Sequence, residues 1–190
     1  MNDLGIRNIL KRTELSTYIN DTHSRVVEEL KLPVAKARID IAVVNGHLHG
    51  YEIKSAQDTL QRLPSQLIAY SKVFDYLTVV TELKYHQKVI NIIPAWVGLA
   101  VCSDKEGEEE FEIIHPPILN INQDGFFIAK LLWHSELVEV LQEQNIPFKK
   151  KNRSWLLCEL LAANIETTTL STLVRNKLKK RHEWKLQKTI

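Results

Sequence analysis

The sequence predicts an α/β body followed by an all-helical end, on three observations. Short runs rich in β-branched residues, such as YLTVVT at 76–81, are typical of buried strands. Segments with apolar residues at helical spacing alternate with these runs, as at Leu63, Leu67, Tyr70 and Phe74. After Gly125 the helical period continues and no strand signal returns.

The body is predicted to contain three helices and six strands. Pro64 suits the first turn of the second helix, and Pro94 follows the third. In chain order we expect a helix over 3–20, strands over 25–32, 38–44 and 48–55, a helix over 63–75, a strand over 76–81, a helix over 84–93, and strands over 96–102 and 111–114.

Helices over 126–144, 154–164 and 170–187 make up the predicted C-terminal part. We place a soft boundary at 118–124, which gives a core domain over 1–117 and a helical, basic appendage over 118–190. The appendage resembles a helix-turn-helix only loosely, because its turn lacks a well-placed glycine.

Composition excludes several classes of protein. With 190 residues, 44% hydrophobic and 25% charged, the chain can bury a substantial core and is neither disordered nor fibrous. No apolar run reaches the ~18 residues of a membrane span, and charges near the N-terminus argue against a signal peptide. The two cysteines, Cys102 and Cys158, form no metal-binding pattern. We expect a soluble, cytoplasmic protein without a membrane partner.

The charge distribution is asymmetric. Residues 146–190 carry 11 Lys and Arg against three acids, whereas residues 1–145 carry 14 basic and 20 acidic side chains. A basic end of this kind indicates contact with nucleic acid or a solvated basic helix. The candidates for phosphate contacts are Arg62, Lys149, Lys150, Lys151, Arg153, Arg175, Lys177, Lys179, Lys180 and Arg181.

The stretch RIDIAVVNGHLHGYEIKS, residues 38–55, is predicted to be a hairpin whose strands are interrupted by Asp40, Glu52 and Lys54. A two-residue loop would pair positions that sum to 91 and place the two acids on opposite faces. A three-residue loop at 45–47, or a bulge at Gly50, pairs positions that sum to 92. We predict the second register, with Asp40 opposite Glu52 and Arg38 opposite Lys54.

Two carboxylates at ~4 Å would repel each other by roughly 4 kcal/mol at an effective dielectric constant near 20, so a cation is expected between them. Lys54 could supply that charge. Mg²⁺ prefers one or two carboxylates together with carbonyl, water or phosphate oxygens, which Asp40, Glu52 and the Ile53 carbonyl would provide.

The pattern Asp40, Glu52-Ile53-Lys54 resembles that of the PD-(D/E)XK nuclease superfamily, with Ile39 in place of its proline. Gln66 and Tyr70 are similar to the QxxxY motif of its RecB-type branch. The longer phrase ARIDIAVVNGHLHGYEIKSAQDTLQRLPSQLIAYSKVFDYLTVV, with the Trp-bearing helical end, resembles a small bacterial and phage family that carries an "sce" designation. The resemblance covers nearly the whole chain and is strongest over 38–80.

This resemblance implies a restriction-endonuclease-like αβββαβ core with a mixed central sheet flanked by helices. It also implies a metal-dependent nuclease that hydrolyses phosphodiester bonds, with Mg²⁺ or Mn²⁺ at Asp40, Glu52 and Ile53. Lys54 would orient or activate the attacking water, and Gln66 and Tyr70 would support the site or contact the backbone of the nucleic acid.

An upstream acid often completes this site in the superfamily. Glu28 and Glu29 both precede Asp40, alternation does not choose between them, and the resemblance favours Glu29; Glu14 is a remoter candidate. We expect nucleic acid as the partner, with DNA foremost, and leave open homo-oligomerisation, the number of metals, and endo- versus exonuclease action. The alternative is a non-catalytic nucleic-acid-binding or complex-assembly protein that retains the nuclease fold.

Overall fold

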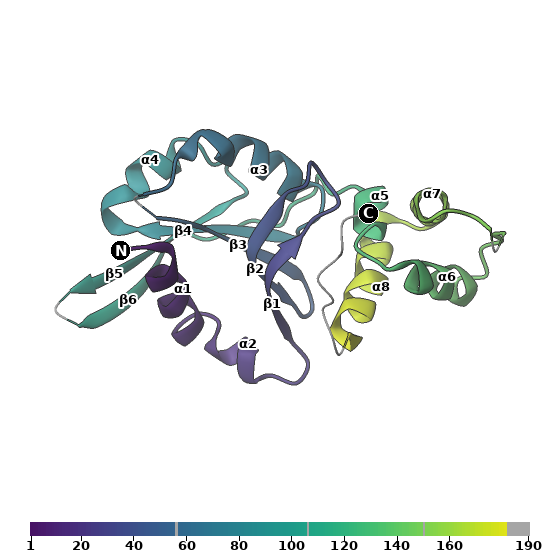
Figure 1. The fold of residues 1–190 in the computed structure, drawn as a ribbon, viewed down its shortest axis with the longest axis horizontal. Helices are drawn as coiled ribbons and strands as arrows, with labels where there is room; N and C mark the ends of the chain where they lie inside the picture. The colour runs from purple at the N-terminus through teal and green to yellow at the C-terminus, as the bar shows by residue number, and fades with distance from the viewer. Residues whose placement is uncertain (56, 106, 150, 182–190) are drawn as a thin grey trace.

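A six-stranded mixed sheet forms the centre of the molecule, in the order β1-β2-β3-β4-β5-β6 (Figure 1). The structure is a computed structural model that describes residues 1–55, 57–105, 107–149 and 151–181. The strands are β1 (Arg25–Lys31), β2 (Arg38–Val44), β3 (Leu48–Lys54), β4 (Tyr76–Glu82), β5 (Gly98–Lys105) and β6 (Glu108–His115). β1, β2 and β3 are antiparallel, β3, β4 and β5 are parallel, and β6 is antiparallel to β5. The predicted α/β class with a mixed sheet is confirmed.

Helices cover both faces of this sheet, so its strands are buried on two sides. On one face α1 (Asp3–Arg12) packs Ile6, Ile9 and Leu10 against a cluster that includes Tyr51 and Val80. α2 (Ser16–Asn20) follows and contacts β1. On the other face lie α3 (Leu63–Ser71) and α4 (His86–Ile90), preceded by single 3₁₀ turns η1 (Leu60–Arg62) and η2 (Leu83–Tyr85) (Figure 1).

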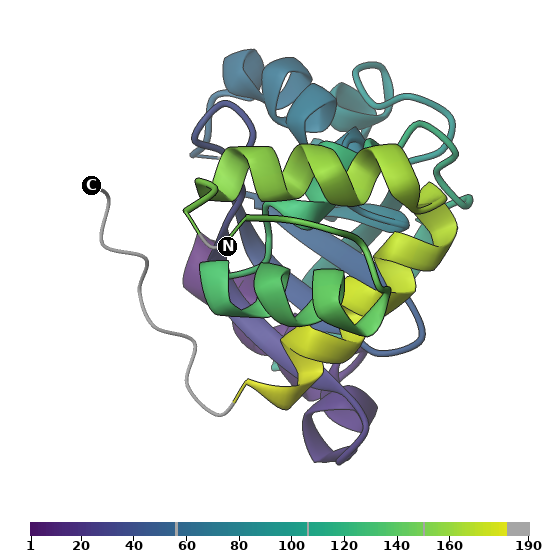
Figure 2. The same cartoon turned by 90° about the vertical axis from the view of Figure 1, so that its right-hand side faces the viewer.

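The C-terminal helices pack against one another beside the sheet (Figure 2). They are α5 (Gly125–Ala129), α6 (His134–Glu143), α7 (Ser154–Asn164) and α8 (Thr167–Lys180). One continuous buried cluster joins them to the body, since it contains Phe74 and Leu77 together with Leu161 and Val174. The division into a core over 1–117 and an appendage over 118–190 stays a prediction.

Two of the predicted helices are each interrupted in the structure. The helix expected over 3–20 is broken at Thr13, which has non-helical backbone angles and bonds back to Ile9, and Leu15 then turns into the core. The helix expected over 126–144 is two helices, because Leu131 and Leu132 are buried in the intervening turn and α6 starts anew at His134.

The last helix begins at Thr167 rather than at 170 and ends at Lys180, after which Arg181 is extended. The remainder of the prediction, 182–187, lies outside the described residues. The helix expected over 63–75 ends earlier, at Ser71, where backbone N–H groups of Val73 and Phe74 close the turn on the Tyr70 carbonyl.

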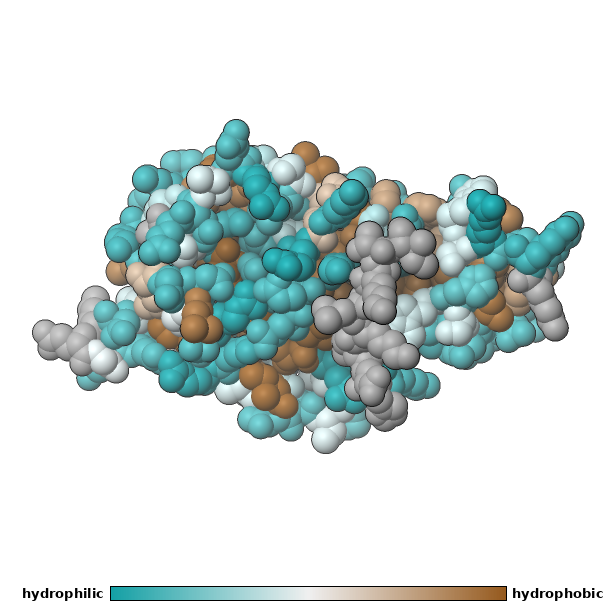
Figure 3. Space-filling model, viewed as in Figure 1, coloured by the Kyte–Doolittle hydropathy of each residue, from teal (hydrophilic) through white to brown (hydrophobic). Residues whose placement is uncertain are grey.

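The surface shown in Figure 3 is mostly hydrophilic, with apolar residues in small separate patches. Within the part of the chain that the structure describes, every helix is too short or too polar to cross a bilayer.

Candidate active site

The register of the β2–β3 hairpin brings the predicted acids together. Ile41 pairs with Tyr51, Ala42 with Gly50 and Val44 with Leu48, so the paired positions sum to 92 and the loop is Asn45-Gly46-His47. The predicted register is therefore confirmed, and its continuation sets Asp40 opposite Glu52. The ladder itself stops at Ile41, and the backbone N–H of Ile53 donates instead to Asp40 Oδ2 at 2.7 Å.

Glu52 lies at the centre of a buried hydrogen-bond network, with only 2% of its surface exposed. Its Oε1 accepts from Lys54 Nζ at 2.6 Å and from Gln66 Nε2 at 2.7 Å. The Tyr70 hydroxyl donates to Glu52 Oε2 at 2.6 Å and accepts from Gln66 Nε2 at 3.2 Å. Gln66 Oε1 in turn accepts from Lys54 at 3.0 Å. The four side chains thus fix one another's orientation.

Local sequence explains why α3 supplies two of these groups. Pro64 occupies the first turn of the helix, and Leu63 and Leu67 anchor it in the core. Gln66 and Tyr70 are four residues apart and therefore share the face that overlies β3. Burial raises the pKa of Tyr70 above its usual value, and the adjacent Glu52 charge adds to the shift, so the hydroxyl keeps its proton.

Asp40 is held between β3 and α1. Arg7 Nη2 lies 3.3 Å from Asp40 Oδ1, and Arg7 Nη1 donates to the Asp40 carbonyl at 3.2 Å. Burial and, after it, the Glu52 charge raise the pKa of Asp40 to about 7, against the opposing effects of the Ile53 N–H and Arg7. The repulsion expected between the two acids is thus only partly compensated by the protein.

The upstream acids do not extend this carboxylate pair directly. Glu29 has φ 55°, in the left-handed region, which lets two consecutive side chains of β1 reach one guanidinium. Arg7 contacts Glu28 Oε2 at 3.3 Å and Glu29 Oε1 at 3.0 Å, and Arg38 Nε lies 2.7 Å from Glu29 Oε2. Glu14 instead accepts from the Tyr51 hydroxyl at 3.3 Å.

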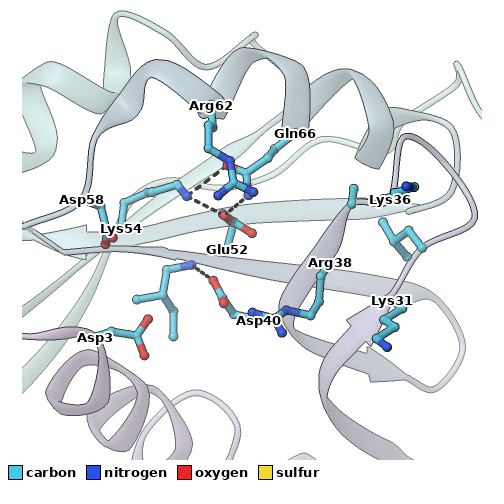
Figure 4. A pocket seen from close by; sticks show the side chains of 13 residues that line it. Asp3, Lys31, Lys36, Arg38, Asp40, Glu52, Lys54, Asp58, Arg62 and Gln66 are labelled. Atoms are coloured by element: carbon cyan, nitrogen blue, oxygen red, sulfur yellow. Dashed lines mark hydrogen bonds and ion pairs between the residues drawn. The ribbon is translucent and has the colours of Figure 1, made fainter. Parts of the chain in front are cut away.

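An open pocket of about 750 Å³ lies over these carboxylates (Figure 4). Asp40, Glu52, Ile53, Lys54 and Gln66 line it, together with Arg62. Its other charged residues are Asp3, Lys31, Lys36, Arg38 and Asp58, of which the predicted register had indicated only Arg38, opposite Lys54. Figure 4 shows Lys31, Lys36 and Arg38 on one side of the pocket and Lys54 and Asp58 on the other. Asp58 is fixed by accepting from the Ser55 N–H and hydroxyl, both at 2.8 Å.

The donor set fits a hard divalent cation with few protein ligands. A carboxylate offers about four lone-pair sites. Three donors occupy those of Glu52, and two occupy those of Asp40, so each acid retains capacity for a metal. Among the described residues no three His, Cys, Asp or Glu converge. A site with two carboxylates is sufficient for Mg²⁺, because this ion often binds one or two carboxylates and completes its octahedron with water and phosphate oxygens.

Most of the predicted basic contacts lie elsewhere. Arg175 pairs with buried Asp75 at 3.0 Å, Lys177 lies within 2.9 Å of Glu139 and Glu143, and Arg181 pairs with Glu136. These three cations hold the C-terminal helices in place. The exposed candidates are Lys149, Lys151, Arg153 and Lys180, Lys179 is half-buried, and Lys150 lies outside the described residues. Of the predicted contacts that the structure describes, only Arg62 lines the pocket.

Comparison with known proteins places the chain in a family. The family model described as bacteriophage P4 protein cII matches residues 7–189. The chain belongs to the phage P4 cII family. Protein cII of Enterobacteria phage P4 is 27% identical over 157 residues, which is 83% of this chain and 59% of the phage protein. This cII-family chain therefore spans less than two thirds of the curated relative it matches.

A solved structure of a protein of unknown function from Silicibacter pomeroyi is also similar to this cII-family chain. It shares 14% identity, covers 80% of this chain and 99% of its own, and superposes with a TM-score of 0.45. The resemblance to PD-(D/E)XK nucleases stays a prediction.

Proposed function

We propose that this protein is a metal-dependent nuclease that hydrolyses phosphodiester bonds of DNA. The observation that carries the proposal is the convergence of Asp40, Glu52 and Lys54 in one pocket, with Gln66 and Tyr70 bonded to Glu52. The pair of acids is costly in a folded protein, because the charge of one opposes ionisation of the other. Binding of a cation between the two carboxylates would explain why the protein keeps them so close together.

Asp40 and Glu52 would hold Mg²⁺ or Mn²⁺, with the Ile53 carbonyl as a further ligand. The ion would polarise a phosphoryl oxygen and lower the pKa of bound water. Lys54, anchored by Glu52 and Gln66, would orient the attacking water or neutralise charge on the phosphate, and it needs no proton transfer for this. Gln66 and Tyr70 keep the Glu52 carboxylate in one orientation.

Incubation of pure protein with labelled single-stranded and duplex DNA tests the proposal, in Mg²⁺, in Mn²⁺ and in EDTA. Asp40→Asn, Glu52→Gln and Lys54→Met should each lower the cleavage rate at least about 100-fold, the usual effect of losing a group that stabilises transition-state charge. Glu159→Gln is the matched control, because it removes an exposed carboxylate on α7. Equal cleavage by wild type and all variants would identify a contaminating nuclease.

The second candidate is a nucleic-acid-binding or complex-assembly protein without turnover. The observation that favours it is the network around Glu52, in which Lys54, Gln66 and Tyr70 satisfy the carboxylate without a metal. Binding of DNA in EDTA, combined with no cleavage of DNA or RNA in either metal, would support this candidate and reject the nuclease.

A further inference from the structure

The turn between β1 and β2 is unusual for its residue types. Ala35 and Lys36 have φ values of 49° and 54°, and the Ala37 N–H donates to the Val34 carbonyl at 2.9 Å. Two positive φ values in the centre of such a turn belong to type I′, which strongly favours Asn and Gly. This chain uses residues with a Cβ at both positions, so the turn is strained.

The strained turn is nevertheless firmly held. Leu32 is buried, its N–H donates to the Ala37 carbonyl at 2.8 Å, and Val34 and Ala37 pack against the main core cluster. Between these anchors Ala35 and Lys36 are exposed, and of the two Lys36 lines the pocket over Asp40 and Glu52. The backbone that carries Lys36 at the rim of the pocket therefore has little freedom.

Lys36 also differs from two other cations of the pocket, Lys54 and Arg38, whose charges are neutralised by ion pairs. Lys54 is paired with Glu52, and Arg38 with Glu29. Over the residues that the structure describes, neither Lys36 nor Arg62 has an ion-pair partner. Figure 4 places Arg62 next to Glu52 and Lys36 at a separate point of the rim, on the side of Lys31 and Arg38. An anion that enters the pocket meets uncompensated positive charge at these two points.

We propose that Lys36 binds a backbone phosphate of the nucleic acid next to the scissile one and so positions the strand over Asp40 and Glu52. This inference rests on the proposed function and identifies the phosphodiester backbone, rather than a base, as what the β1–β2 turn recognises. Strain maintained at an exposed turn is expected where the residue has a role in binding, because a glycine there would otherwise be favoured.

Two glycine variants distinguish the effect of backbone strain on stability from the effect of the Lys36 charge on binding. Ala35→Gly and Lys36→Gly should each raise the melting temperature by about 2–4 °C, because each removes a left-handed residue with a Cβ. Only Lys36→Gly should weaken binding of a labelled 20-mer DNA duplex in EDTA. One phosphate contact releases ~0.9 counterion, so its loss should weaken binding about eightfold at 0.1 M salt. The slope of log K against log salt concentration should decrease in magnitude by about 0.9.

The outcomes distinguish this inference from the proposed function. If Lys36→Gly binds the duplex as Ala35→Gly and wild type do, with the same salt slope, the inference is wrong, while cleavage by wild type still decides the nuclease proposal. If wild type binds neither the duplex nor its single strands, the inference is also wrong. If Lys36→Gly weakens binding as expected but no metal supports cleavage, the inference stands and the nuclease proposal fails.

Discussion

Replacing Asp40 by asparagine should stabilise the metal-free protein more at pH 8 than at pH 5, where less than half of the cost of ionising Asp40 is present. The usual pKa of an aspartate is 3.8, whereas the folded protein raises the pKa of Asp40 to about 7. Between these pH values the folded state binds more protons than the unfolded state, so stability falls as pH rises, and the full loss is present above pH 7.

The size of the effect follows from this shift in pKa. Three pKa units correspond to about 4 kcal/mol, which is the upper limit for the cost of ionising Asp40 in the folded state. Because 20% of the side chain is exposed, water screens part of this cost, and a gain of about 1–3 kcal/mol is expected for Asp40→Asn at pH 8. Asparagine retains an oxygen that can accept from the Ile53 N–H.

Urea unfolding in EDTA at pH 5 and pH 8 measures this difference. The matched control Glu159→Gln removes an exposed carboxylate on α7, so its effect should be within about 0.5 kcal/mol at both pH values. A gain for Asp40→Asn of equal size at the two pH values would refute the titration. A loss at pH 8 would show that the pair with Arg7 outweighs burial and repulsion.

Three further predictions concern the network, the ion pairs and the metal. Tyr70→Phe should lower the free energy of unfolding by about 1–3 kcal/mol, because buried Glu52 loses a donor, and an unchanged urea midpoint would contradict this. Arg175→Met should lower the free energy of unfolding by about 3–5 kcal/mol, because it leaves the buried Asp75 carboxylate without its ion-pair partner. Lys177→Met should lower it by less than about 1 kcal/mol, because the carboxylates that Lys177 contacts are half-exposed. Equal losses for the two variants in urea unfolding would contradict this reasoning. Mg²⁺ should raise the melting temperature more at pH 8 than at pH 6, because the metal competes with a proton for the Asp40 carboxylate. If Asp40→Asn shows the same increase in melting temperature, the metal binds elsewhere.

The hairpin shows what the sequence could predict. Its register follows from loop length and from the need to bury apolar side chains, because a slip of one residue would turn every side chain to the other face. Gln66 and Tyr70 could be placed on one face of α3 for a similar reason, since helical spacing fixes their relation within a single element. The resemblance to a known motif singled out Gln66 and Tyr70, and local periodicity then sufficed to place them on the face of α3 that meets Glu52.

The rest of the site depends on contacts between distant segments. Arg7 reaches Asp40 from a separate helix, 33 residues earlier, and nothing in its local pattern distinguishes it from a surface arginine. Arg175 is likewise one of many cations in a basic segment until its buried partner, Asp75, is known. Charge density could be predicted from the sequence, but whether a charge is used within the molecule or presented to a ligand could not.

Backbone strain and buried charge occur together around one pocket. Of the four non-glycine residues with positive φ in the described part of the chain, Ala35 and Lys36 lie in the turn beside the pocket. Glu29 contacts Arg7, which pairs with Asp40, and Arg38, which lines the pocket. A fold selected for stability alone would place glycine at such positions and apolar residues beneath the pocket. Local rules that are broken together at one place are typical of functional sites. Stabilising substitutions should therefore concentrate at this pocket, and those that remove a charged side chain should weaken the binding or the chemistry that the charges support.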